Sequence, residues 1–157
     1  MRIYIETTVF NYYIDSNRDG HQDTIQLFDE IRLGKYEAYT SEYVIIELQK
    51  APEPKKSEMR DLIDKYNIKV IPLDDRAERL SDLYVINNVI PERFRFDSTH
   101  IAVASVHGLD YVISYNFRHI NRAKTKLLTA RINNAEGFGT VVICTAKEVL
   151  DDEQNYE

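Results

Sequence analysis

The stretch RIYIETT, residues 2–8, joins a short run of isoleucine and tyrosine to an abrupt group of polar side chains. Isoleucine and tyrosine favour strands, so we expect a strand over residues 2–5. Runs of similar character lie at 37–40, 68–73, 111–114 and 140–144. Longer segments with helical spacing separate these runs. Such alternation predicts a single α/β domain built on a parallel sheet.

The helices are predicted by apolar residues that recur every three or four positions. Ile25, Phe28 and Ile31 form one such stripe, which stops at Gly34, where we expect a left-handed glycine. Further stripes are Met59, Leu62, Ile63 and Tyr66; Ala77, Leu80, Leu83 and Tyr84; Ile101, Ala104 and Ser105, before Gly108; and Ile120, Ala123 and Leu127. Ser41 and Asp74 each precede a helical run and are expected to cap it.

The chain of 157 residues is the length of one domain. Residues 15–20 (DSNRDG) and 51–56 (APEPKK) have the composition of short connections, and neither is long enough for a domain linker. We therefore expect one domain over residues 1–150. The acidic segment 151–157 (DDEQNYE) is expected to be a frayed tail.

Composition excludes several classes of protein. Lys and Arg number 20 against 26 Asp and Glu, so the net charge is −6, which argues against a basic protein that coats nucleic acid. The single cysteine, Cys144, excludes an internal disulfide framework, and a reducing, cytoplasmic compartment is the expectation. The first ten residues do not resemble a signal peptide, and no apolar run reaches the roughly 20 residues of a membrane span.

Polar side chains follow the predicted strands where a parallel sheet places its ligand site. Glu6-Thr7-Thr8 follows the first strand and Ser114-Tyr115-Asn116 the fourth. Asp97 opens the segment DSTHIAVAS, and Glu47 interrupts the apolar run VIIEL, where a carboxylate needs a partner. Carboxylate oxygens suit magnesium or manganese, so an acidic metal site is one interpretation.

Each of these residues also has a structural interpretation. Glu47 fits an ordinary helix surface, Asp97 fits an N-cap, and Glu6 fits a partner of an arginine. His100 and His119 are interpreted as packed or surface histidines, because no HxH or HExxH spacing accompanies them. Cys144 lies in an apolar strand and is interpreted as a core residue. The chain has neither a GxGxxG nor a GxxxxGK[ST] phosphate-binding motif.

Four segments in this order resemble a PIN domain, and in particular the VapC-like ribonucleases of toxin-antitoxin systems and their uncharacterised relatives. They are Glu6-Thr7-Thr8, SEYVIIEL (41–48), DSTHIA (97–102) and SYNFRHI (114–120). The resemblance runs from Ile3 to about Leu150. It implies a three-layer α/β/α fold with a five-stranded parallel sheet, and a divalent-metal-dependent endoribonuclease that hydrolyses RNA phosphodiester bonds.

The resemblance also implies roles for individual residues. Glu6, Glu47 and Asp97 take the positions of acidic ligands for Mg²⁺ or Mn²⁺, and Asn116 takes the fourth acidic position. Glu6 is longer than the aspartate usual in the family, and Asn116 lacks its charge, so we expect one ion rather than two. Thr7, Thr8 and Ser114 are expected to hold these catalytic side chains by hydrogen bonds.

A basic segment supports RNA as the substrate. Residues 111–134 contain no Asp or Glu, yet carry five cations: Arg118, Arg122, Lys124, Lys126 and Arg131. The remainder of the chain is then −6 − 5 = −11. We expect the first four cations to bind RNA beside the acidic site, the other interpretation being a solvated helix face. As partners, the resemblance implies a small antitoxin protein and a second copy in a homodimer.

Two other functions remain open from the sequence. Glu6 and Asn116 favour a catalytically weakened or inactive PIN-like module that binds RNA or protein. An α/β domain that binds a small phosphorylated ligand is the other alternative, although the chain has no phosphate loop.

Overall fold

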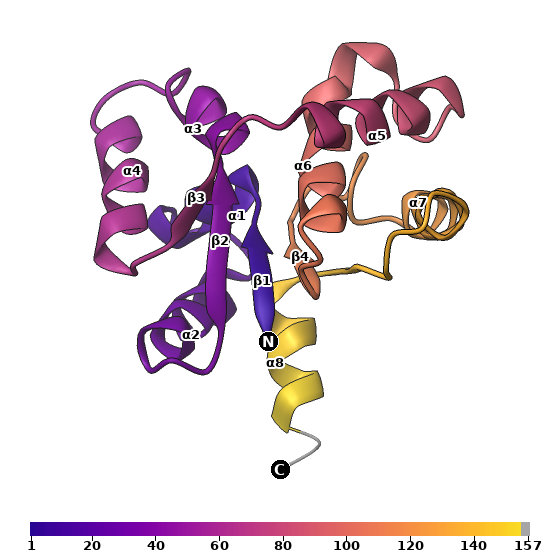
Figure 1. Ribbon diagram of the computed structural model, residues 1–157. Coiled ribbons are helices and arrows are strands. Elements are labelled where there is room, and N and C mark those ends of the chain that lie inside the picture. The colour runs from indigo at the N-terminus through magenta and orange to yellow at the C-terminus, as the bar shows by residue number, and fades with distance from the viewer. Residues whose placement is uncertain (155–157) are drawn as a thin grey trace.

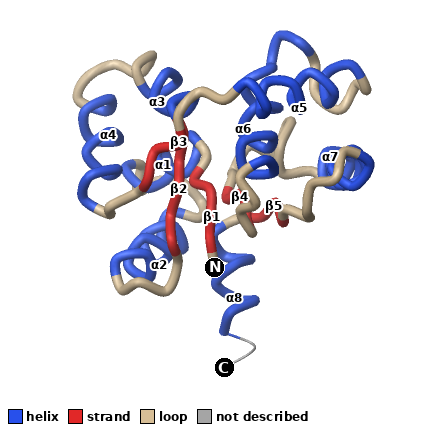
Figure 2. The backbone as a smooth tube through the Cα atoms, viewed as in Figure 1, coloured by secondary structure: helices blue, strands red, loops and turns tan. Residues whose placement is uncertain are grey.

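The computed structural model describes residues 1–154 and contains one five-stranded, all-parallel sheet. The strands are β1 (Arg2–Ile5), β2 (Glu37–Ser41), β3 (Lys69–Ile71), β4 (Tyr111–Ile113) and β5 (Val142–Cys144). Their order across the sheet is β3-β2-β1-β4-β5 (Figure 2). The five predicted strands are confirmed, with β3, β4 and β5 shorter than expected.

Helices cover both faces of this sheet, which makes the predicted α/β/α arrangement (Figure 1). They are α1 (Thr7–Ile14), α2 (His21–Arg32), α3 (Glu42–Leu48), α4 (Lys55–Lys65), α5 (Asp75–Ile86), α6 (Arg95–Val106), α7 (Ala123–Ala135) and α8 (Ala146–Gln154), with a 3₁₀ turn η1 (Glu92–Phe94) before α6. Helices α1, α2 and α4 lie on one side of the sheet, and α5, α6 and α7 on the other. Parallel strands require such crossover connections, because after each strand the chain must return to the same end of the sheet before the next strand begins.

Strand β1 forms the centre of the core. Ile3, Tyr4 and Ile5 have no exposed surface, because β2 and β4 flank the strand and helices cover both faces. Cys144 in β5 is also buried, as predicted for a core residue. Burial raises the pKa of its thiol to about 12, which keeps it protonated and inert.

Local signals in the sequence set several helix ends. The Ser41 hydroxyl accepts a hydrogen bond from the Val44 amide at 3.4 Å, and Asp74 accepts one from the Arg76 amide at 2.8 Å, so both predicted N-caps are confirmed. Gly34 and Gly108 adopt φ values of +82° and +65° just after α2 and α6. Both glycines therefore end their helices in the left-handed conformation.

Helix α7 differs from its predicted apolar stripe. Ile120 precedes the helix, and Leu127 is 53% exposed. The buried face of α7 is polar instead, with Thr125, Thr129 and Asn133. The Asn133 side chain donates from Nδ2 to Ser105 Oγ at 2.8 Å, and its Oδ1 accepts a hydrogen bond from the Tyr84 hydroxyl. The buried polar atoms of Asn133 are therefore satisfied by residues of α5 and α6.

The end of the chain also differs from the prediction. Asp151 to Gln154 continue α8, so this part of the expected frayed tail is helical, and the rest of that tail, residues 155–157, lies outside the described residues. The side chains of Val149 and Leu150 anchor α8 in the core. Within residues 1–154, no helix is both long and apolar enough to cross a bilayer.

Candidate acidic site at the carboxyl end of the sheet

The strand order brings the ends of β1 and β4 together. Ile5 pairs with Ile113, so Glu6 and Ser114, the next residue of each strand, meet at the same edge. The Ser114 hydroxyl donates to Glu6 Oε1 at 2.6 Å, although 108 positions separate the two residues. The two polar groups that follow the first and fourth strands therefore form one site, as predicted for a parallel sheet.

Glu6 is held from three directions and is only 2% exposed. Besides Ser114, the Thr8 hydroxyl donates to Oε1 at 2.6 Å and the Thr8 amide to Oε2 at 3.3 Å, so Glu6 also caps α1. Burial raises the pKa of Glu6, and the nearby His100 and these hydroxyl groups offset only part of that effect. Among the described residues Glu6 makes no ion pair with an arginine, which was one interpretation of the sequence.

Glu47 reaches the site from α3. Its Oε1 accepts a 2.7 Å hydrogen bond from the Thr7 hydroxyl and contacts Nε2 of His100. The side chain is 25% exposed, so it is neither a core residue nor an ordinary surface glutamate. Partial burial acts to raise the pKa of Glu47, but the His100 charge and the hydrogen bonds from His100 and Thr7 outweigh it and lower that pKa. Glu47 is therefore held as a carboxylate.

His100 lies fully buried beneath the acidic residues. Its Nδ1 is 2.6 Å from the Tyr4 hydroxyl, which in turn lies 2.7 Å from Ser41 Oγ. Burial alone would lower the pKa of His100, but Glu47, Glu6 and Asp97 together raise it. A protonated ring donates from both nitrogens, to Tyr4 and to Glu47. His100 is therefore packed, as predicted, and the three acidic residues together favour its protonated form.

Asp97 approaches from α6. The helix begins at Arg95, so Asp97 lies in its first turn and is not the N-cap, contrary to one interpretation of the sequence. Asp97 Oδ2 lies 2.9 Å from His119 Nδ1. The His119 backbone amide donates to Asn116 Oδ1 at 3.0 Å, and the backbone amide of Asn116 donates to Ser114 Oγ at 3.0 Å. Asp97 is thus connected through Asn116 and Ser114 to Glu6.

The donor chemistry of the site fits a divalent cation, although the three carboxylates do not form one ligand shell as they stand. Within residues 1–154, no three Asp, Glu, His or Cys side chains are arranged to enclose a metal ion. In the same part of the chain, Glu47 Oε2 and Asp97 Oδ1 accept no hydrogen bond from protein. Magnesium is commonly held by one or two carboxylates with waters and phosphate oxygens. Glu47 and Asp97 supply such oxygens, whereas those of Glu6 face Thr8 and Ser114.

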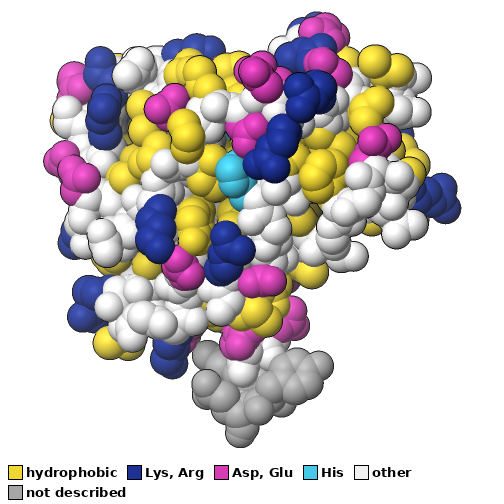
Figure 3. Space-filling view, in the orientation of Figure 1, with side chains coloured by type: hydrophobic (Ala, Val, Ile, Leu, Met, Phe, Trp, Pro, Cys, Tyr) yellow, Lys and Arg dark blue, Asp and Glu magenta, His cyan; other side chains and the backbone are white. Residues whose placement is uncertain are grey.

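The predicted RNA-binding cations do not all lie at this site. The Arg118 guanidinium lies 5.1 Å from the centre of the Phe94 ring, which packs 4.2 Å from His119. Arg122 instead donates to Val89 O and Thr125 Oγ1, both at 3.1 Å, and so holds the start of α7. Lys124 and Lys126 lie on α7, Lys124 exposed and Lys126 half-buried. The face in Figure 3 shows positive and negative side chains interspersed, with no wholly basic surface.

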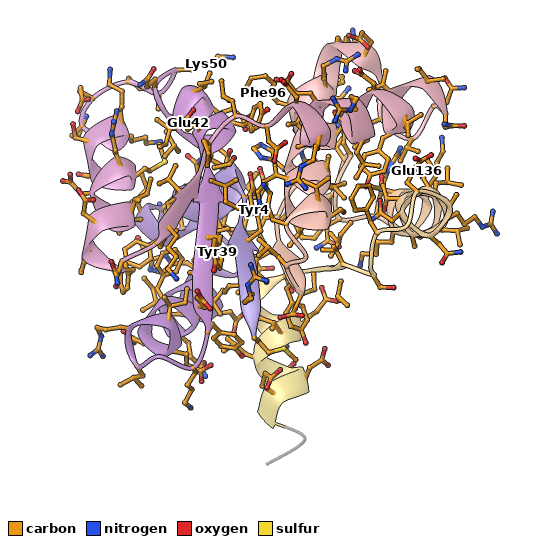
Figure 4. All side chains as sticks on the ribbon, in the orientation of Figure 1. Tyr4, Tyr39, Glu42, Lys50, Phe96 and Glu136 are labelled. Carbon is orange, nitrogen blue, oxygen red and sulfur yellow. The ribbon has the colours of Figure 1, made fainter. Side chains whose placement is uncertain are left out.

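A hollow of about 420 Å³ adjoins the acidic site between the end of α3 and the start of α6. Glu47 and Asp97 line it together with Lys50, Arg93, Phe94 and Phe96, and the Glu92–Arg95 pair completes its wall. Figure 4 shows Lys50 and Phe96 together at the upper, carboxyl end of the sheet. Sequence reasoning missed these residues, as well as Tyr4. The spacing of three residues from Asp97 to His100 and from Asn116 to His119 was the available signal for the histidines.

Comparisons with known proteins agree with this architecture. The family model described as PIN domain matches residues 3–125. Mycobacterium tuberculosis VapC20, described as a Sarcin-Ricin loop cleaving toxin, is similar at a TM-score of 0.59 and 14% identity, covering 89% of this chain and 98% of its own. Rickettsia felis VapBC2, bound to a DNA fragment from its promoter, is similar at a TM-score of 0.55 and 13% identity. That match covers 91% of this chain and 97% of the Rickettsia chain. No curated protein sequence matches.

Proposed function

The chain belongs to the PIN-domain family, and on that premise we propose that it is a divalent-cation-dependent endoribonuclease. The observation that carries the proposal is the placement of three acidic residues at one edge of the sheet: Glu6 after β1, Glu47 on α3 and Asp97 on α6. Glu47 contacts the buried His100, and hydrogen bonds through Ser114, Asn116 and His119 connect Glu6 to Asp97. Acidic groups are costly to gather unless a cation or a proton compensates them. One histidine compensates only part of this charge, which leaves room for a cation.

The proposed cation is Mg²⁺ or Mn²⁺, held by Glu47 and Asp97 with Glu6 as the third acidic group. When bound, it would activate a water for in-line attack on a phosphodiester and neutralise charge on the scissile phosphate. His100 and Thr7 hold Glu47 in place, and His119 holds Asp97. Asn116 already accepts a hydrogen bond through Oδ1, so its amide nitrogen is the group that would orient a water or a phosphate oxygen.

The partners are part of the same proposal. The similar Rickettsia protein is a VapBC complex, so we propose that this chain is the toxin of a toxin-antitoxin pair that acts in the cytoplasm. A small antitoxin could mask the site by placing an arginine against Glu47 and Asp97, because guanidinium groups bind carboxylates in a bidentate manner. We also propose a homodimer. Co-purification from the native cells and light scattering of the purified chain test these two partners.

Metal-titrated cleavage of a short single-stranded RNA tests the activity. We expect cleavage with magnesium or manganese, none with chelator, and a loss of at least about a hundredfold in Asp97→Asn, because that change removes a charge that holds the cation. Asp61→Asn is the matched control, since Asp61 is exposed on α4 and makes no ion pair within residues 1–154. Cleavage that persists in chelator would refute the metal mechanism.

A catalytically weakened binding module is the second candidate. It is favoured by the hydroxyl groups that donate to Glu6 and by the uncharged side-chain amide of Asn116 in an otherwise acidic site. This function predicts RNA or protein binding without metal-dependent cleavage. In Asn116→Asp the new carboxylate can still accept the His119 amide. Cleavage that appears only in Asn116→Asp would identify a weakened enzyme rather than a module that never cleaves.

A further inference from the structure

Two cations, Lys50 and Arg93, line the hollow between α3 and α6, and a third, Arg118, lies against the Phe94 ring that also lines it. Lys50, Arg93 and Arg118 make no ion pair within the described residues 1–154, whereas Arg95 is paired with both Glu92 and Asp82. The charges of the Glu92–Arg95 pair in the same lining cancel, so +3 from these cations and −2 from Glu47 and Asp97 leave +1. A net positive rim around an acidic floor attracts phosphate groups while leaving the carboxylates to a cation.

Two phenylalanines support these cations. The Phe94 ring packs against His119, and the guanidinium groups of Arg93 and Arg118 lie 5.0 and 5.1 Å from its centre. An arginine that rests on an aromatic ring loses less freedom when it binds a ligand. Phe94 therefore holds the Arg93 and Arg118 guanidinium groups near His119, the hydrogen-bond partner of Asp97.

Phe96 has a different environment. Tyr43 meets it edge-on with ring centres 5.7 Å apart, and within residues 1–154 the one cation near its face is the Lys50 ammonium, at 5.9 Å. That distance is at the outer limit of a cation–π contact, so Lys50 covers the ring loosely. A planar group could take the place of Lys50 over Phe96 at little cost. The displaced ammonium would then lie near the phosphates of the same ligand.

We propose that this hollow is a nucleotide subsite that takes one unpaired base of single-stranded RNA. The base stacks on Phe96, and Lys50, Arg93 and Arg118 bind the phosphates on either side of it. The volume of about 420 Å³ is within the range of small-ligand pockets. A base inside a duplex is stacked on its neighbours and cannot enter, so the subsite selects single-stranded RNA. The inference rests on the proposed ribonuclease function and adds how that substrate is held.

RNA binding in chelator tests the subsite separately from cleavage. The probe is an eight-nucleotide, fluorescein-labelled RNA, measured by anisotropy over a range of salt, with a duplex of the same strand as comparison. We expect Lys50→Ala and Arg93→Ala each to weaken binding about three- to tenfold and to reduce the salt slope by about 0.7. Arg60→Ala, an exposed α4 cation without an ion pair within residues 1–154, should change neither quantity.

The aromatic contact has its own variant. Phe96→Leu keeps an apolar side chain in the half-buried position, so we expect it to fold, to weaken single-stranded binding about tenfold and to leave the salt slope unchanged. It should also lose most of the preference for single strand over duplex. Thermal unfolding of each variant confirms that the fold is retained.

The outcomes separate this inference from the proposed function. If the wild type cleaves RNA, but all three variants bind like Arg60→Ala, the subsite is wrong and the ribonuclease stands. If the variants lose RNA binding as expected, but the wild type does not cleave RNA with any metal, the nucleotide subsite is supported and the ribonuclease proposal is refuted. A wild type that neither binds nor cleaves RNA overturns both. A poly-glutamate peptide that displaces RNA at equal charge concentration would show that only charge is recognised, and would overturn the stacking contact.

Discussion

The hydroxyl of Tyr4 lies 2.6 Å from Nδ1 of His100, so the central strand supports the histidine that contacts Glu47. The line of contacts runs from Ser41 through Tyr4 and His100 to Glu47, and all but the last residue are fully buried. Its members come from β1, β2, α3 and α6. The buried side chains of Ser41, Tyr4 and His100 therefore fix the position of the Glu47 carboxylate, and we expect substitutions of these residues to move it.

Removal of the histidine should destabilise the protein. His100→Ala leaves Glu47 without its histidine partner and the Tyr4 hydroxyl with Ser41 as its remaining partner, and we expect a loss of about 3 kcal/mol in the free energy of unfolding. Tyr4→Phe removes one hydroxyl at nearly constant volume and should cost about 1–2 kcal/mol. Urea unfolding in chelator measures both. Equal losses in the two variants would contradict the importance of the His100–Glu47 contact.

The same pair makes stability depend on pH. The three acids raise the pKa of His100 above its ordinary value of about 6.5. The contribution of the protonated histidine is therefore complete below that ordinary value and is lost as the pH rises through the raised one. In chelator, the stability advantage of the wild type over His100→Gln should be larger at pH 6 than at pH 9. An advantage that grows toward pH 9 would mean that the buried ring is neutral.

Glu6 should show the same direction of pH dependence over a more acidic range, because its pKa is also raised but from the lower ordinary value of a glutamate. Burial raises its pKa, so the folded state increasingly disfavours the ionised carboxyl as the pH rises above the ordinary glutamate value. Thermal unfolding in chelator should show Glu6→Gln gaining stability relative to the wild type between pH 4 and pH 8. Glu58→Gln on the exposed face of α4 should show no such gain. A steady loss over this range would indicate that Glu6 is stabilised as a carboxylate.

The same Glu6 variant tests the cation site. Loss of its charge beside Glu47 should raise the magnesium concentration for half-maximal cleavage about 10- to 100-fold, because groups that surround a metal site tune its affinity. Isothermal titration with Mn²⁺ gives the affinity without cleavage. Unchanged affinity would remove Glu6 from the acidic set and leave only its hydrogen bonds to Thr8 and Ser114.

Gly20 should be sensitive to the smallest substitution. Its φ is +104°, and an added Cβ would lie 3.2 Å from Cε1 of Tyr115, whose ring stacks on Tyr12 at 3.8 Å. We expect Gly20→Ala to cost about 1–2 kcal/mol in thermal unfolding, from backbone strain and displacement of this stack. Gly139→Ala is the control, because no atom lies within 4 Å of its added Cβ. An equal loss of stability in Gly20→Ala and Gly139→Ala would argue against backbone strain and the Tyr115 contact as the cause.

Much of the fold followed from local patterns. The β-rich run at 2–5 forms β1, and the run at 111–114 contains β4, which ends one residue earlier than expected. The caps at Ser41 and Asp74 are as expected, because such signals act within a few residues. Helix α7 escaped this reasoning. Its buried face is polar, with Thr125, Thr129 and Asn133, and burial of Asn133 is satisfied only because α5 and α6 supply Tyr84 and Ser105 as partners.

The sequence by itself determined the PIN-like order of strands and helices, and it indicated Glu6, Glu47, Asp97 and Asn116 at the ends of predicted elements. Only the tertiary structure decided how those groups are used. Glu6 is enclosed by hydroxyl groups, Glu47 shares a buried histidine, and Lys50 and Phe96 meet beside them. The reason is physical: periodicity records which face of an element is buried, whereas a site depends on distances between elements that the sheet order alone brings together.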